Sequence, residues 1–220
     1  MPRRAVVFDL FGTLIDDTPP EAYRVLLADI AGQLGADPEE FRAAWARHDI
    51  SRYTEPIEDT FGAMCTDLGV GGAGIEAALA FRRDHLRKLL IPRPDALSTV
   101  QALRDRGLKV GMISNASSEM SALWRESAFA DVFDAVLFSA DERMMKPDRR
   151  LYERMAELLE VSSGDCVFVG DGAYRELQGA EAAGMSAVLI KVPHDEWEHE
   201  GTVGWAGPRV SSLSEVLALV

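Results

Sequence analysis

An acidic residue directly after a strand-like run, near the start of the chain, constrains the fold more than any other feature. The run Ala5–Phe8 is apolar and rich in β-branched and aromatic residues, and Asp9 follows it. This pattern predicts a buried strand that leads into a tight loop. Open α/β sheets bind ligands at the carboxyl ends of their strands, so we expect Asp9 to face a crevice as a nucleophile, base or metal ligand. Taken alone, such a residue is also often a turn former or a helix cap.

A second apolar run ends in two hydrogen-bonding side chains. Leu108–Asn115 predicts another strand, and its last two residues are Ser114 and Asn115. A hydroxyl and an amide can both donate hydrogen bonds to an anionic oxygen. The alternative is that they cap the helix expected to begin near Ser117.

A lysine precedes a proline at the entrance of a predicted helix. Pro147 disfavours helical geometry for Lys146, and Asp148 is a plausible cap for the helical pattern that follows. A lysine held in this way can neutralise a nucleophilic carboxylate and a substrate anion. The alternative is a solvated surface lysine.

A third apolar run leads to two more carboxylates. Cys166–Gly170 predicts a strand, Asp171 follows it, and Glu176 comes five residues later at the start of a helix rich in small residues. Two carboxylates at this spacing can flank one hard cation. Their alternatives are a turn residue and a charge on a helix surface.

Together these four segments resemble the motifs of the haloacid dehalogenase superfamily of hydrolases, and the resemblance covers essentially the whole chain. The residues that carry it are Asp9 to Thr13, Ser114, Lys146, and Asp171 with Glu176. The resemblance implies an α/β fold with a Rossmann-like parallel sheet, helices on both faces, and a helical cap inserted after the first strand. It also implies that Asp9 attacks the substrate and forms a covalent ester, which water then hydrolyses.

The resemblance further assigns a metal and a substrate site. For a phosphoryl substrate, Mg²⁺ would be held by Asp9, Asp171 and the backbone carbonyl of Phe11, with waters oriented by Glu176. Such an oxygen-only set of ligands suits Mg²⁺. The remaining implied roles are catalytic for Lys146 and Ser114, and substrate-binding for Thr13, Asn115 and Phe11.

Phe11 and Asp171 point to different branches of the superfamily. Phosphatases usually carry a second Asp where Phe11 stands, as a general acid and base, and the dehalogenase branch tends to have an aromatic residue there. Dehalogenases of this type work without metal and usually have a neutral residue in place of Asp171. A carboxylate beside Asp9 without a cation is costly, because like charges repel. We therefore expect a Mg²⁺-dependent phosphate-ester hydrolase, with a 2-haloacid dehalogenase or a catalytically weak binding protein as alternatives.

Strand-like and helical patterns alternate along most of the chain, which favours a parallel sheet with helices on both faces. The expected strands are Ala5–Leu10, Leu108–Ser114, Ala135–Ser139, Cys166–Gly170 and Ser186–Ile190. Residues 16–90 contain four helical patterns and no clear strand. We expect them to form the cap over a core of residues 1–15 and 91–220, with a return hinge at 91–94. A helix at 96–106 and a short final helix at 210–219 complete the prediction.

Net charge and hydropathy limit the kinds of molecule that this protein can bind. A net charge of −13 argues against nucleic acids and anionic membrane surfaces, and no stretch approaches the 18 apolar residues of a membrane span. The start, Met1–Arg4, is too short for the charged region of a signal peptide. Two cysteines on different elements indicate no disulfide and fit a reducing cytoplasm. We expect a cytoplasmic monomer or homodimer that acts on a small anionic molecule.

Cap residues should decide specificity. Four arginines could reach a substrate carboxylate or phosphate, and they are Arg24, Arg42, Arg47 and Arg52. Trp45 and Tyr53 could line the pocket, although solvated arginines and a core tryptophan are equally plausible. His194 and His199 lie in a polar tail, and we interpret them as loop residues rather than metal ligands.

Overall fold

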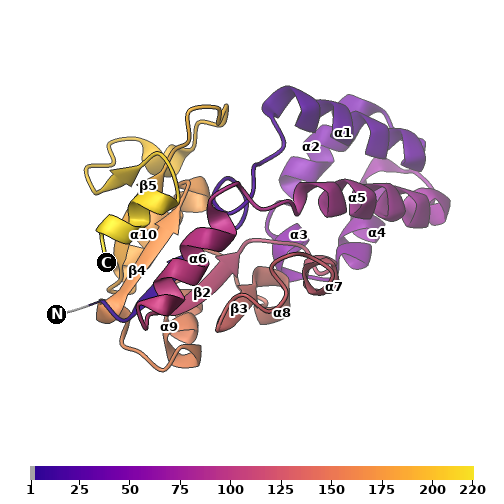
Figure 1. Ribbon diagram of the computed structural model, residues 1–220. Coiled ribbons are helices and arrows are strands. Elements are labelled where there is room, and N and C mark those ends of the chain that lie inside the picture. The colour runs from indigo at the N-terminus through magenta and orange to yellow at the C-terminus, as the bar shows by residue number, and fades with distance from the viewer. Residues whose placement is uncertain (1–2) are drawn as a thin grey trace.

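The centre of the molecule is a parallel β-sheet. The computed structural model describes residues 3–220, so Met1 and Pro2, and with them part of the expected N-terminal segment, lie outside the described residues. Within that range the sheet has six strands in the order β3-β2-β1-β4-β5-β6, all paired in parallel (Figure 1). The strands are β1 (Ala5–Phe8), β2 (Lys109–Ser114), β3 (Ala135–Phe138), β4 (Cys166–Gly170), β5 (Ser186–Ile190) and β6 (Arg209–Val210). The expected fold class is confirmed.

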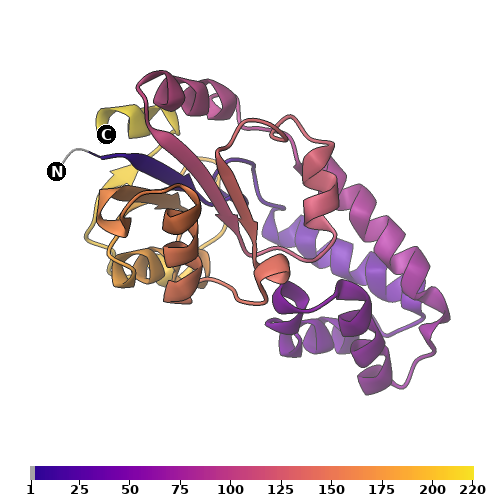
Figure 2. The same cartoon turned by 90° about the horizontal axis from the view of Figure 1, so that it is seen from below.

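Helices cover both faces of the sheet, because successive side chains of a strand point to opposite sides. Val6 and Phe8 pack with α6 (Ala96–Asp105) and α7 (Met120–Arg125) on one face. Ala5 and Val7 pack with α9 (Arg149–Leu158) and α10 (Glu176–Ala182) on the other. Figure 2 shows α6 and α9 on opposite sides of the strands. The short α8 (Ser139–Glu142) follows β3 directly.

The strand order places the first strand at the centre of the sheet. β1 lies between β2 and β4, and all their carboxyl ends meet at one edge. This edge is where open parallel sheets bind their ligands. The segments after β1, β2 and β4 therefore converge there, as the sequence predicts.

A helical unit follows β1 and lies over this edge. Within residues 16–90, all of which are described, the helices are α1 (Pro20–Leu34), α2 (Pro38–Arg47), α3 (Ser51–Thr54), α4 (Ile57–Leu68) and α5 (Ile75–Leu89). They enclose their own apolar core, with Ile30, Phe41 and Phe61 fully buried. The division of the chain into a cap of residues 16–90 and a core of the remainder stays a proposal, which this separate core supports.

Two local expectations need correction. α3 was not among the expected helices, because one helical turn is too short to show a helical periodicity. The final helix expected at 210–219 is a 3-10 helix at Ser214–Ala218, and Arg209–Val210 instead extends the sheet as β6. The buried residues of this segment, Val210, Leu213 and Val216, recur every three residues. This spacing is compatible with an α-helix and with a 3-10 helix, so it could not distinguish the two. No helix in residues 3–220 has the length and hydropathy that crossing a membrane requires.

Candidate active site

The loop after β1 is shaped around Asp9. The backbone N–H of Asp9 donates to the carbonyl of Val169 on β4 (2.9 Å), which fixes the strand end beside its neighbour. Gly12 follows with a φ of +70°, and a Cβ atom there would lie 2.2 Å from Oδ2 of Asp171. Glycine is therefore required both for the turn and for the approach of Asp171. The two carboxylates of the first and fourth motifs meet across this loop.

Lys146 is held against two carboxylates. Its Nζ pairs with Asp9 Oδ1 and Glu176 Oε2, and its side chain is 3% exposed. Asn115 positions it, because Asn115 Oδ1 accepts from the Lys146 N–H (2.8 Å) and Asn115 Nδ2 donates to the Lys146 carbonyl (3.2 Å). Asp148 caps α9 by accepting from the N–H of Arg150 (3.0 Å), as predicted. The alternative that Lys146 is a solvated surface residue is wrong. The Asn115 side chain, which we expected to contact the substrate, binds the backbone of Lys146.

Three carboxylates form a compact cluster. One oxygen each from Asp9, Asp171 and Glu176 lie within 4.8 Å of one another, and all three residues are buried. Gly170 makes room for Glu176, since a Cβ atom at Gly170 would lie 2.1 Å from Glu176 Oε1. That oxygen also accepts from the N–H of Gly172 (3.0 Å). The surface-charge alternative for Glu176 is therefore wrong.

Burial dominates the charge state of the cluster. Burial raises the pKa of Asp9, and Asp171 adds to this, while Lys146 opposes it. Burial and the charge of Asp9 raise the pKa of Glu176 well above its usual range. Burial alone would lower the pKa of Lys146, but Asp9 and Glu176 outweigh it and raise that pKa, so the ammonium stays charged. Lys146 pairs with Asp9 and Glu176 and does not pair with Asp171, the third carboxylate of the cluster.

A histidine that the sequence analysis left without a role contacts the cluster. His199 Nε2 lies 3.0 Å from Asp171 Oδ2. Burial would raise the pKa of Asp171, but the hydrogen bond and charge of His199 outweigh it and lower that pKa. Burial also opposes charging of His199, yet Asp171 raises its pKa. His199 does lie in a loop, as expected, but no local pattern in the sequence shows that this loop returns to Asp171.

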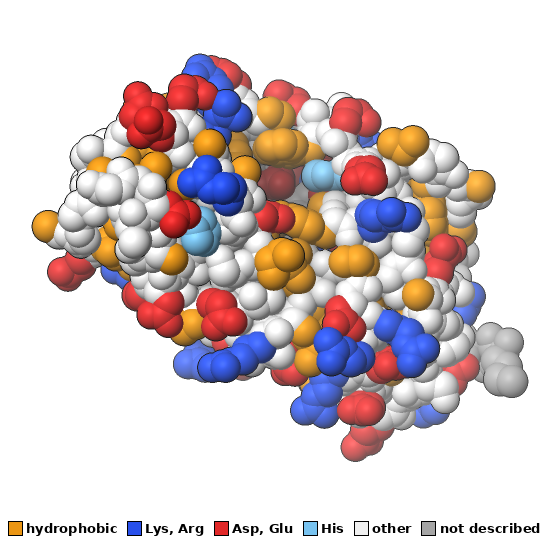
Figure 3. Space-filling model, turned by 180° about the vertical axis from the view of Figure 1, so that it is seen from behind, with side chains coloured by type: hydrophobic (Ala, Val, Ile, Leu, Met, Phe, Trp, Pro, Cys, Tyr) orange, Lys and Arg blue, Asp and Glu red, His pale blue; other side chains and the backbone are white. Residues whose placement is uncertain are grey.

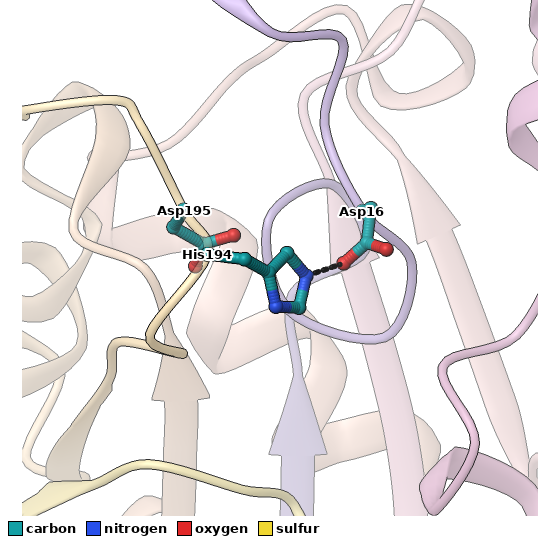
Figure 4. Close-up of side chains that lie close together, drawn as sticks. All are labelled: Asp16, His194 and Asp195. Atoms are coloured by element: carbon teal, nitrogen blue, oxygen red, sulfur yellow. Dashed lines mark hydrogen bonds and ion pairs between the residues drawn. The ribbon is translucent and has the colours of Figure 1, made fainter.

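The other histidine lies in a separate group at the junction of the cap and the core. His194 Nε2 is 2.9 Å from Asp16 Oδ1, and Asp195 lies nearby (Figure 4). The two carboxylates are also paired with Arg93, at 2.8 Å for Asp16 and 2.9 Å for Asp195. Because the guanidinium already pairs with both acids, this group is a poor metal site.

Two expected anion-binding hydroxyls are fully buried. Thr13 and Ser114 have no exposed surface, and neither hydroxyl has a hydrogen-bond partner among residues 3–220. Neither residue lines the open cavity. Buried polar groups are nearly always paired, so two unpaired hydroxyls on the loop and strand beside Asp9 mark a place where a ligand or water completes the bonding.

A cavity of about 400 Å³ lies between the cap and the sheet edge. Figure 3 shows it as a hollow bordered by hydrophobic side chains, with acidic groups deeper inside. Asp9, Lys146 and Asp171 lie on its core side, and Phe11 is half-buried in its wall. Asp17, which the sequence analysis did not single out, also lines it.

The four candidate arginines of the cap differ in their exposure to solvent. Arg24, Arg42 and Arg47 are exposed and pair with acidic residues on the cap surface. Arg52 is instead buried in the cavity wall, where Trp45 and Tyr53 also lie. The wall further contains Arg82 and His85, which the sequence analysis did not identify. Burial, which follows from the tertiary packing of the cap, separates Arg52 from the other three.

The donor set suits a hard divalent cation. Asp9 and Asp171 offer carboxylate oxygens on the cavity wall, and Glu176 lies directly behind them. Oxygen-only ligands are those that Mg²⁺ prefers, and an octahedral Mg²⁺ usually keeps several waters. These residues therefore fit the magnesium site that the resemblance implies.

Comparison with known proteins identifies the family of this chain. The haloacid dehalogenase-like hydrolase family matches residues 3–184. A phosphatase of Mycobacterium tuberculosis (strain CDC 1551 / Oshkosh) is 33% identical over 197 residues, which are 84% of this chain and 86% of the relative. The (S)-2-haloacid dehalogenase 4A of Burkholderia cepacia is 28% identical over 227 residues, which are 99% and 94% of the two chains.

Solved structures share the fold over nearly the whole chain. A HAD phosphatase from Thermococcus onnurineus superposes with a TM-score of 0.70 at 24% identity, covering 98% of this chain and 97% of the other. The motifs, the sheet order, the carboxylate cluster and these likenesses lead to one conclusion. The chain belongs to the haloacid dehalogenase-like hydrolases.

Proposed function

We propose that this hydrolase cleaves small phosphate monoesters with Mg²⁺ and a covalent intermediate on Asp9. The observation that carries the proposal is the approach of Asp171 to Asp9 across Gly12. A second carboxylate beside Asp9 repels an anionic substrate unless its charge is offset; His199 pairs with Asp171 from one side, and a cation between Asp171 and Asp9 would screen both carboxylates from the substrate. A bound Mg²⁺ would supply that charge and stabilise the phosphoryl oxygens.

The side chains around Asp9 fit a nucleophilic role. Lys146 holds Oδ1 of Asp9 and leaves Oδ2 free to attack the phosphorus atom. In the proposed step the new Asp9–phosphorus bond forms as the bond to the ester oxygen breaks, and the leaving alkoxide takes a proton from water. Water then attacks the phosphorus, and Asp9 is released with inorganic phosphate. Ser114 and Thr13 do not line the cavity, so their unpaired hydroxyls would reach the bound anion only after the residues beside Asp9 turn toward it.

Further features of the chain support the location and the substrate size that we infer. Cys65 and Cys166 are both free and buried, which is consistent with a reducing cytoplasm. The cavity has the size of a small-molecule site. We infer a cytoplasmic enzyme, monomeric or homodimeric, with a small anionic substrate. The phosphatase of Mycobacterium tuberculosis, as a relative above 30% identity, supports this proposal.

A second candidate is a 2-haloacid dehalogenase, and Phe11 favours it. Phe11 lines the cavity and offers no proton to a leaving group. Halide leaves without a proton, so attack of Asp9 on carbon would not need the acid that Phe11 replaces. The relative from Burkholderia cepacia is itself named a dehalogenase. Asp171 weighs against this reading, because it adds a carboxylate beside Asp9 that attack on carbon does not need, and His199 is paired with only this acid of the cluster.

One experiment separates these functions. Phosphate esters and 2-haloacids are assayed with Mg²⁺ and with chelator, for the wild type, Asp9→Asn and Asp171→Asn. We expect phosphate release that needs Mg²⁺, no turnover by Asp9→Asn, and calorimetric Mg²⁺ binding that Asp171→Asn loses. Asp59→Asn, at an exposed position of α4, is the matched control and should bind Mg²⁺ like the wild type. Halide release in chelator would instead establish the dehalogenase, and Mg²⁺ binding without turnover would favour a binding protein.

A further inference from the structure

One cation in the cavity wall has hydrogen-bonding capacity that the protein does not use. The Arg52 side chain, on α3, is buried, and its Nε has no hydrogen-bond partner among residues 3–220. Its Nη2 pairs with Asp49, so the guanidinium is anchored at one end only. An unpaired buried donor costs free energy, which a bound acceptor would recover.

Aromatic side chains fix the orientation of this guanidinium. Its central carbon lies 4.2 Å from the ring centre of Trp45 and 5.0 Å from that of Tyr53. Trp45 is itself held by Tyr23, whose hydroxyl accepts from Trp45 Nε1 (2.8 Å). The Tyr23 hydroxyl thereby keeps its own hydrogen for another acceptor. Tyr23, Trp45, Arg52 and Tyr53 all line the cavity, and we refer to these four residues as the cap subsite.

The neighbouring arginine is already neutralised. Arg82 pairs with buried Glu119 and donates through Nη2 to the hydroxyl of Ser117 (3.1 Å). Asp49, the partner of Arg52, is more exposed and also accepts from Tyr174 (2.8 Å). Glu119 likewise accepts from a second donor, the Ser117 hydroxyl (3.0 Å), but its side chain is 5% exposed, whereas that of Asp49 is 36% exposed and its charge is better screened by water. Arg52 is the better placed of the two guanidiniums to bind a ligand.

The rest of this cavity wall is apolar. Leu26, Leu27 and Ile30 of α1 contribute to it, together with Leu86 of α5 and Met120 of α7. Apolar walls with a few polar groups are typical of sites that bury the body of a small ligand and fix its orientation. The charge near Arg52 is partly balanced by Asp49, which favours a singly charged group over a doubly charged one.

We propose that the cap subsite binds a carboxylate on the substrate, so that the preferred substrates are phosphate monoesters whose short apolar body ends in a carboxylate. The phosphate end is bound at Asp9, and the carboxylate accepts from the Arg52 guanidinium and the Tyr23 hydroxyl. This inference rests on the proposed function for the phosphate end. Planar, fork-shaped recognition of carboxylates is the usual use of arginine in such sites.

The test compares pairs of substrates. Alkyl phosphates of increasing chain length are assayed with Mg²⁺ beside ω-carboxyalkyl phosphates of the same length. For the wild type, kcat/KM should favour the carboxylate member at the length that spans the cavity. A hydrogen bond to a charged group contributes about 1.5–3 kcal/mol, so this preference should fall about 10- to 100-fold in Arg52→Gln. Arg52→Lys should restore only part of it, because lysine lacks the fork.

Arg42→Gln is the matched control, since Arg42 is an exposed cap arginine paired with Glu39, and it should keep the full preference. Equal turnover of both members at every length by the wild type overturns the cap subsite but leaves the phosphatase proposal intact. If no phosphate ester is turned over, the phosphatase proposal fails. Calorimetric binding of ω-carboxyalkyl and alkyl phosphonates to the wild type and Arg52→Gln then decides the subsite, and equal affinities for both ligands overturn it.

Discussion

Phe11 is the side chain that most directly limits the chemistry of this site. It lies two residues after Asp9 and is half-buried in the wall of the cavity. A phenyl ring can neither protonate a leaving alkoxide nor take a proton from water. General acid–base catalysis is worth about 10²- to 10⁴-fold, so a phosphatase with Phe11 should be slow on esters with poor leaving groups.

Phe11→Asp should therefore raise the phosphatase rate, by up to about 10²-fold in kcat/KM. An alkyl phosphate should gain more than an aryl phosphate, because its poorer leaving group needs the proton. Phe11→Asn is the matched control, since an asparagine side chain has nearly the same volume as an aspartate but carries no carboxyl group that could donate a proton. Unchanged or lower rates on both esters, in a stable Phe11→Asp protein that still binds Mg²⁺, would show that Phe11 does not stand in for a missing acid.

Asp17 is a second residue whose charge depends on its surroundings. Burial raises the pKa of Asp17 to about 6, and the charges of Asp171 and Asp9 add to this while His199 opposes it. The folded protein therefore binds a proton at Asp17 more tightly than the unfolded chain does. The stability that this proton contributes is complete below the unfolded pKa and is lost as the pH rises through about 6.

Comparison with Asp17→Asn should reveal that loss in the presence of chelator. Relative to the variant, the wild type should lose about 2 to 3 kcal/mol of unfolding free energy between pH 4 and 7. Urea unfolding at several pH values measures the difference. Asp29→Asn, at an exposed position of α1, is the control and should follow the wild type throughout. A constant difference between the wild type and Asp17→Asn across this range would contradict the raised pKa of Asp17.

Among the structural elements, the loop after β1 does most to assemble the site. It turns at Gly12 in the left-handed region and leaves space for the Asp171 carboxylate at the end of β4. Gly170, at the last position of β4, makes room for Glu176 in the same way. Two glycines therefore let two neighbouring strand ends bring their acids together. These positions require glycine for space rather than for flexibility alone.

Gly12→Ala should weaken Mg²⁺ binding about 10- to 100-fold, because the added methyl group displaces Asp171. It should also cost about 1 to 2 kcal/mol of stability through its positive φ. Gly107→Ala is the matched control, since Gly107 has a φ of +80° and open space where a Cβ would lie. Both variants should lose stability, and only Gly12→Ala should lose affinity in a calorimetric titration. Equal Mg²⁺ affinities in the two variants would mean that Gly12 does not position Asp171.

In the whole molecule, the connection from the cap back to the core is fixed by one buried arginine. Arg93 donates its N–H to the carbonyl of Leu14 (2.9 Å), beside the point where the chain leaves β1 for the cap. Its side chain pairs with Asp16 and Asp195, the carboxylates drawn in Figure 4. Arg93 therefore links three segments: the connection that leaves β1, the hinge that returns from the cap, and the loop that contains Asp195 and His199.

Arg93→Met should destabilise the protein by about 2 kcal/mol, since it leaves the mostly buried Asp195 without its partner while Asp16 can turn to solvent. Denaturant unfolding measures the change. Arg87→Met is the control, because Arg87 is an exposed arginine paired with Asp84, and it should change the stability little. If both variants unfold at the same denaturant concentration as the wild type, the hinge does not depend on Arg93.

The fold was predictable because its signals are local. Apolar runs of strand length, separated by helical patterns, specify a parallel α/β sheet, and the first, second and fourth strands each end in a polar motif at the same edge. β6 and α3 were not predictable, because two and four residues are too few to show a periodicity.

The sequence by itself determined that Asp9, Lys146, Asp171 and Glu176 should converge, since the topology of parallel strands leaves them one common edge. Only the tertiary structure decided which other side chains meet them there. His199 reaches Asp171 from a loop near the end of the chain, and Asn115, expected at this edge as a substrate ligand, holds the Lys146 backbone from the end of β2. Arg52 differs from Arg42 in burial, not in local pattern. Such contacts depend on how loops and helices pack over long sequence separations, and no short-range periodicity records that packing.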